Sequence, residues 1–186
     1  NAPIAVKESL GVARQAMDLP EAELWEVSRG ASERVRATED FKEGPRALAM
    51  KQRFEAAGLA NVRMDEAGNV LGDRAGASPR PRVVLAAHLD TVFPDGTDIR
   101  VRRDGDVLRA PGIADDGRGL AVLLGVARAL EAAGVRTRGS IAFVADVGEE
   151  GLGDLRGMKQ LFGTTLKGQI DAFVSVDGGG HDITTV

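Results

Sequence analysis

Three apolar runs in this sequence each end directly in side chains of the kind that bind metal ions. The runs cover residues 82–87, 141–145 and 172–176. The side chains that follow them are His88 and Asp90 after the first run, Glu149 and Glu150 after the second, and Asp177 after the third. A continuous apolar run of this length is typical of a strand that is buried on both faces. Parallel strands bring their carboxyl ends to one edge of a sheet, so we expect these side chains to converge there.

The segments between the runs indicate an α/β fold. Residues 120–130 place apolar side chains nearly all round a helix, Val122 among them, which predicts a helix packed against the sheet. A shorter helix is expected over residues 155–162. The alternation of strand and helix predicts right-handed crossovers and a mixed, largely parallel sheet with helices on both faces.

The first part of the chain reads as mostly helical. Helices are expected over residues 4–17, 21–36 and 46–57, the last of them ended by Gly58. Short strands are then expected at residues 62–64 and 69–71, followed by a loop over residues 72–81, which is rich in Gly, Ser and Pro. Further along, Asp104-Gly105 predicts a β-hairpin.

Composition excludes several classes of protein. The 186 residues include 24 Lys and Arg against 28 Asp and Glu, a formal net charge of −4, whereas a nucleic-acid binder normally carries a basic stripe. Cysteine is absent, which excludes disulfides and thiolate ligands and favours a reducing compartment, so we expect a cytoplasmic protein. No apolar run reaches the length of about eighteen residues that a transmembrane helix needs. We therefore expect neither a nucleic-acid nor a membrane partner.

Several carboxylates and an imidazole gathered at one edge of a sheet need compensation of their charge. The carboxylates are Asp90, Asp115, Asp116, Glu149, Glu150 and Asp177. A pair of divalent metal ions would remove the cost of like-charge repulsion and desolvation, and such a pair suits hydrolysis of an amide or ester by an activated water. Each motif alone also fits a buried histidine or a solvated turn, so the prediction of a metal site depends on their joint placement at strand ends.

Four segments resemble a known family in order and spacing. They are residues 86–92 (AAHLDTV), 112–119 (GIADDGRG), 148–155 (GEEGLGDL) and 176–179 (VDGG), and the upstream residues 65–70 (DEAGNV) also fit. From about Pro20 onward the sequence is similar to the zinc-dependent exopeptidases and deacylases that include peptidase T, acetylornithine deacetylase, aminoacylase and the glutamate carboxypeptidases.

This resemblance implies the ligands of two divalent metal ions. His88 and Asp177 would bind the first ion, Glu150 would bind the second, and Asp115 would bridge the two. Zinc is the metal that the resemblance favours, with cobalt or manganese as alternatives. The peptide bond between Asp115 and Asp116 would be cis.

The resemblance also implies a reaction. Glu149 would be the general base, and Asp90 would accept a hydrogen bond from the second ring nitrogen of His88 and so fix its tautomer. Asp rather than Glu at position 177 resembles peptidase T and the aminoacylases more than the glutamate carboxypeptidases. The function that the resemblance implies is that of a peptidase T-like exopeptidase acting on short peptides. An N-acyl amino-acid deacylase or a carboxypeptidase with the same site, and a non-catalytic interaction module stabilised by metal, remain alternatives.

Relative to this family, the chain is expected to be the N-terminal portion of a catalytic domain. Residues 1–186 would stop about where a smaller lid domain begins, so the lid and the last metal-binding histidine would be missing. His181 is interpreted as a turn residue without metal contact. The second metal site would then be incomplete, the fragment would be inactive and would expose apolar surface, and the full-length protein would dimerise through its lid.

Overall fold

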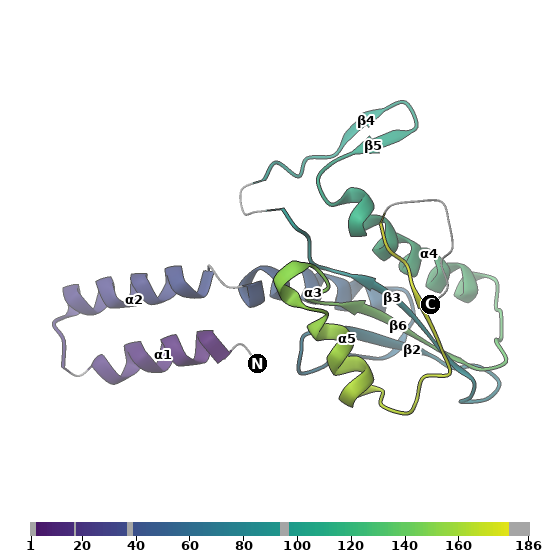
Figure 1. The fold of residues 1–186 in the computed structure, drawn as a ribbon, viewed down its shortest axis with the longest axis horizontal. Helices are drawn as coiled ribbons and strands as arrows, with labels where there is room; N and C mark the ends of the chain where they lie inside the picture. Colours follow the sequence, from purple (N-terminus) through teal and green to yellow (C-terminus); the bar gives the residue numbers. More distant parts are fainter. Residues whose placement is uncertain (1–2, 17, 37–38, 94–96, 179–186) are drawn as a thin grey trace. The chain divides into compact units, whose positions relative to one another are not determined.

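The computed structural model describes residues 3–16, 18–36, 39–93 and 97–178. The chain divides into two compact units, Asn1–Arg46 and Ala47–Val186. In the first unit, α1 (Pro3–Gln15) and α2 (Glu21–Arg36) run side by side (Figure 1). An ion pair of 2.8 Å between Arg34 on α2 and Glu8 on α1 joins them. Both helices were predicted from the sequence.

The second unit is built on a five-stranded sheet (Figure 1). Its strands, in spatial order, are β1 (Ala60–Met64), β2 (Val70–Arg74), β6 (Ser140–Asp146), β3 (Arg82–His88) and β7 (Ala172–Ser175). The three strands formed by the apolar runs, β6, β3 and β7, are parallel, and β1 and β2 are antiparallel additions at one side. The sheet is therefore mixed with a parallel centre, as the sequence predicts.

Helices cover both faces of this sheet. On one face, α3 (Glu39–Ala56) and α4 (Gly119–Ala132) bury Phe54 and Leu123 against Phe143. On the other face, α5 (Arg156–Gln160) leads into the π-helical turn η3 (Leu161–Thr165), which buries Leu161 against Val144. Because successive side chains of a strand point to opposite faces, β6 serves both cores with neighbouring residues. The α/β class with helices on both faces is confirmed.

The predicted loop over residues 72–81 is wrong at its start, because β2 continues to Arg74. Gly72 reads as a loop residue, yet it lies within the strand, where a side chain would crowd Leu59 and Phe54. Glycine is used there for close packing of the end of α3 on the sheet rather than for a turn.

Burial was overestimated at two elements. β7 was predicted to be covered on both faces, but it is the edge strand beyond β3, and Val174 is 46% exposed. In α4, Val122 is 42% exposed although the apolar pattern continues nearly all round the helix. Both differences arise because exposure depends on which neighbours reach a surface, which apolar character alone does not determine.

The predicted hairpin forms as a separate two-stranded sheet, but its turn is Gly105-Asp106, because Asp104 is still in the strand and pairs with Val107. Its strands are β4 (Arg102–Asp104) and β5 (Val107–Arg109), and Gly105 has the positive φ of 58° that such a turn requires. Among the residues described, no helix has the combination of length and apolar character that crossing a bilayer needs.

Candidate metal centre

The parallel strands deliver the predicted residues to one edge of the sheet. His88, the last residue of β3, lies opposite Asp146, the last residue of β6. Beyond β7, the amide of Val176 still donates to the carbonyl of Ala86 at 2.8 Å, so Asp177 follows immediately beside the end of β3. Segments almost ninety residues apart in sequence thus meet at the carboxyl ends of neighbouring strands.

One group of possible metal ligands is formed by His88, Asp115 and Asp177. The Nε2 atom of His88 lies 2.7 Å from Oδ1 of Asp115 and 3.5 Å from Oδ1 of Asp177. The imidazole is buried, while both carboxylates are about half exposed. Asp115 lies in the π-helical turn η1 (Ile113–Arg118) that precedes α4, and its peptide bond to Asp116 is cis, as the resemblance implies. One nitrogen and two carboxylate oxygens therefore face a common space that opens to solvent.

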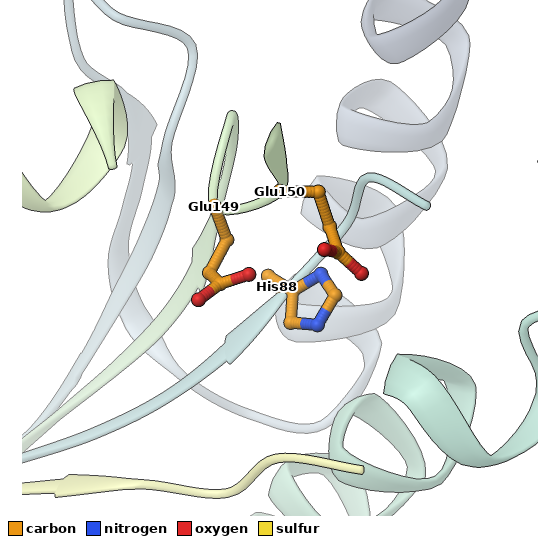
Figure 2. A group of neighbouring side chains, drawn as sticks. All are labelled: His88, Glu149 and Glu150. Carbon is orange, nitrogen blue, oxygen red and sulfur yellow. The ribbon is translucent and has the colours of Figure 1, made fainter. Parts of the chain in front are cut away.

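A second group consists of His88, Glu149 and Glu150. Figure 2 shows the two carboxylates flanking the His88 imidazole from the turn that follows β6. In each group the candidate ligand atoms lie within 4.8 Å of one another. Among the described residues, Asp115 and Glu150 do not share a group, so a bridging position of Asp115 between two ions stays a prediction. His181 lies outside the described residues.

Asp90 makes different contacts from those expected. The Nδ1 atom of His88 lies 3.1 Å from the backbone carbonyl oxygen of Asp90 and 3.7 Å from its carboxylate, which is beyond hydrogen-bond distance. The carboxylate instead accepts the backbone N–H groups of Glu149 at 3.1 Å and of Glu150 at 2.8 Å. Two amides at the end of a strand have no ladder partner, and the carboxylate supplies one for each.

Electrostatics at this edge reflect an excess of negative charge. Burial by itself lowers the pKa of His88, but the carboxylates of Asp90, Asp116 and Asp115 raise it to about 10. Burial raises the pKa of Glu149; His88 opposes this shift, and the Asp177 carboxylate adds to it. The ring therefore holds its proton more strongly than an ordinary imidazole does, and the pKa of Glu149 lies above its ordinary value, which is the response expected where positive charge is lacking.

Asp116 has a structural role that the sequence does not predict. This residue is buried, accepts the backbone N–H of His88 at 3.1 Å and accepts that of Gly119 at 2.8 Å. A side chain at position 119 would collide with the carboxylate. Asp116 thus ties the turn that carries Asp115 to the end of β3. The Asp-Asp doublet followed three residues later by Gly is the only sequence signal of this arrangement.

Comparison with known sequences supports the resemblance. The sequence model described as Peptidase family M20/M25/M40 matches residues 84–185. Carboxypeptidase G2 of Pseudomonas sp. (strain RS-16) is 31% identical over 131 residues, which cover 67% of this chain and 30% of that protein. The matched region includes every segment of the candidate metal centre.

Solved structures share the fold. A tripeptidase from Staphylococcus aureus superposes with a TM-score of 0.57 at 27% identity, over 72% of this chain and 37% of that chain. The aminopeptidase PepT from Bacillus cereus ATCC 10987 does so with a TM-score of 0.59 at 24% identity, over 72% and 37%. The chain thus spans about a third of the length of these relatives. Because the family's sequence model covers more than half of the chain, and the residues predicted to be its ligands meet at one edge of the sheet, the chain belongs to peptidase family M20/M25/M40.

Proposed function

We propose that this chain carries the metal-binding and proton-transferring residues of a hydrolase that cleaves the amide bond at one end of a short peptide. The observation that supports this most directly is the convergence of His88, Asp115 and Asp177 beside Glu149 and Glu150. Membership of a peptidase family makes the reaction class hydrolysis. The terminal position of the cleaved bond is a proposal supported by the names of a carboxypeptidase and a tripeptidase among the relatives.

The residues present fit divalent metal ions. An imidazole nitrogen and carboxylate oxygens are the ligands that zinc takes in catalytic sites, and cobalt and manganese accept them too. His88, Asp115 and Asp177 would hold one ion, and Glu150 would contribute to a second. When bound, such ions supply positive charge that activates a water and polarises the carbonyl of the scissile bond.

Proton transfer falls to Glu149. Burial and the neighbouring carboxylates raise its pKa, which improves a carboxylate as a base near neutral pH. The Asp90 carboxylate accepts the backbone N–H of Glu149, and this hydrogen bond fixes the backbone from which the Glu149 side chain extends. In the proposed reaction the Glu149 carboxylate accepts a proton from the attacking water and delivers it to the leaving nitrogen.

Substitution of the base tests this proposal. The protein encoded by the complete gene is assayed with tripeptides and with N-acetyl amino acids, and its metal content is measured in parallel. E149Q should keep the metal while turnover falls by about 10²–10⁴-fold, as removal of a general base implies. E131Q, which changes an exposed Glu on α4, is the matched control and should leave both unchanged.

The same assay separates the alternatives. Faster cleavage of N-acetyl amino acids than of tripeptides would replace the peptidase proposal with a deacylase. Wild-type turnover in E149Q would reject Glu149 as the base. Metal binding by the wild type with no hydrolysis of any substrate would reject the hydrolase and favour a metal-stabilised interaction module.

A further inference from the structure

Asn69 is a fully buried polar residue outside the candidate metal centre. It lies just before β2, in the turn from β1, and none of its surface is exposed. Its Nδ2 group donates to the carboxylate of Asp65 and to the carbonyl of Gly157, both at 2.8 Å, and its Oδ1 accepts the backbone N–H of Val147 at 3.1 Å. Both amide protons and the amide oxygen are thus used, as the cost of burying an amide requires.

Two of these contacts lie at the two ends of one segment. Val147 directly follows β6, and Gly157 lies in the first turn of α5. The amide of Gly157 also donates to the carbonyl of Val147 at 3.0 Å, which closes the base of the loop between them. This loop carries Glu149 and Glu150, so Asn69 binds the loop where it leaves and rejoins the core.

The residues just after Val147 are held separately. The Asp90 carboxylate accepts the amides of Glu149 and Glu150. The loop is therefore fixed at two places, by Asn69 at its base and by Asp90 at Glu149 and Glu150. Since the contacts at the base are made to backbone atoms, they determine the path of the chain rather than any side-chain rotamer.

An asparagine is the side chain that this position requires. An aspartate could accept from Val147 but could not donate to Gly157, and it would lie against the Asp65 carboxylate. Asp65 orients the amide in turn, because the same oxygen, Oδ2, also accepts the hydroxyl of Thr165 at 2.8 Å, while Oδ1 accepts the backbone N–H of Asn69 at 3.0 Å. A side chain on Gly157 would collide with the Asn69 amide and the Val147 backbone. The base of the loop is consequently packed as tightly as it is hydrogen-bonded.

We propose that Asn69 is a positioning residue that places Glu149 and Glu150 in the metal centre through the backbone of the loop over residues 147–157. Its importance for catalysis rests on the function proposed above, but its effect on the loop does not. An Asn69 that served only the general stability of the core would instead affect all elements alike.

Hydrogen exchange measured residue by residue on the cation-free chain tests the placement. N69A leaves the Val147 amide without its acceptor, so the amides of residues 147–150 should exchange at least about tenfold faster than in the wild type, while those of α4 stay unchanged. T165V is the matched control, because it removes the hydrogen bonds of the Thr165 hydroxyl to Asp65 and Gln160 without touching the loop, and it should leave these amides at wild-type rates. Unchanged exchange at residues 147–150 in N69A, or an equal increase in α4 or in T165V, would overturn the proposal.

N69D gives a second comparison should N69A fold poorly. It keeps an oxygen for Val147 but removes the donor to Gly157, so faster exchange should again be confined to the loop. Wild-type exchange in N69D would contradict the inference.

Titration of each variant with zinc then links the loop to the metal centre. N69A should lose about tenfold or more in affinity for one ion and keep the other within about twofold, while T165V keeps both. Unchanged affinity for both ions in N69A would overturn the positioning role. A wild-type chain that binds no zinc, together with altered loop exchange in N69A, would reject the proposed function and leave the effect of Asn69 on the loop established.

Discussion

Replacement of Asp90 by Asn is the sharpest test of how the turn carrying Glu149 and Glu150 is held. The Asp90 carboxylate gives one oxygen to each of the two backbone amides, whereas an Asn side chain has a single oxygen. In D90N one amide therefore faces an N–H group and loses its acceptor. A buried donor left without a partner costs about 1–3 kcal/mol.

The pKa of Asp90 gives a second route to the same magnitude. Burial raises this pKa, but the neighbouring His88 and the amides of Glu150 and Glu149 lower it from 3.8 to about 2. That difference corresponds to about 2 kcal/mol in favour of the ionised carboxylate. The free energy of unfolding of D90N should therefore be lower than that of the wild type by about 2 kcal/mol at pH 7.

Urea denaturation in the presence of a chelator measures this difference. The folded pKa lies below the unfolded value, so the stabilisation is complete above about pH 4 and is lost as the pH falls towards 2. The gap between wild type and D90N should be equal at pH 7 and pH 5 and should shrink below 3.8. D98N, which changes an exposed carboxylate paired with Arg100, is the control and should match the wild type. Equal stability of D90N and wild type at pH 7, or a gap that widens in acid, would refute the reasoning.

Other predictions concern the imidazole, the start of α4 and the core. Because the pKa of His88 is raised to about 10, zinc binding at pH 7 should release about one proton. The binding enthalpy measured by calorimetry should then depend on the ionisation enthalpy of the buffer. A binding enthalpy that is the same in all buffers would contradict this prediction. G119A should destabilise the chain by about 1–3 kcal/mol in urea denaturation, because a methyl group at this position collides with the buried Asp116 carboxylate. G125A, in open space on the same helix, is the control and should stabilise the chain by about 0.5–1 kcal/mol. Wild-type stability of G119A would contradict the predicted collision. L123A should cost about 2–5 kcal/mol and V122A under about 0.5 kcal/mol, and equal losses would mean that burial in α4 is assigned wrongly.

The order of strands and helices could be predicted because apolar runs and their spacing are local properties. β3, β6 and β7 appear where the runs stand, and the alternation with helices gives the parallel centre. The burial of β7 could not be predicted in the same way, because a strand's exposure depends on its rank in the sheet. Likewise, Gly72 reads as a loop residue until the approach of Leu59 is seen.

Residue type predicted which side chains gather, but not what each of them binds. Asp115 and Asp116 are neighbours in sequence, yet the Asp115 carboxylate is half exposed beside His88, whereas the Asp116 carboxylate is buried and accepts hydrogen bonds from backbone amides. Both are carboxylates on the same turn, and the direction of each depends on the backbone conformation between them. A pattern of acidic residues therefore indicates a cation site without separating ligands from supports.

Asp90, Asp116 and Asn69 stabilise the metal centre in the same way, by accepting backbone N–H groups. Turns at the carboxyl ends of strands leave backbone N–H groups without ladder partners, and buried donors must be satisfied. Asp90 accepts two such amides, Asp116 accepts another two, and Asn69 accepts one at the base of the same loop. Each support thereby fixes the backbone under a candidate ligand or base. Because these contacts need no bound ion, the centre should be preformed in the cation-free chain, and zinc should change hydrogen exchange at the supported amides by less than about twofold. A much larger protection on zinc binding would mean that the ion, rather than these side chains, organises the turns.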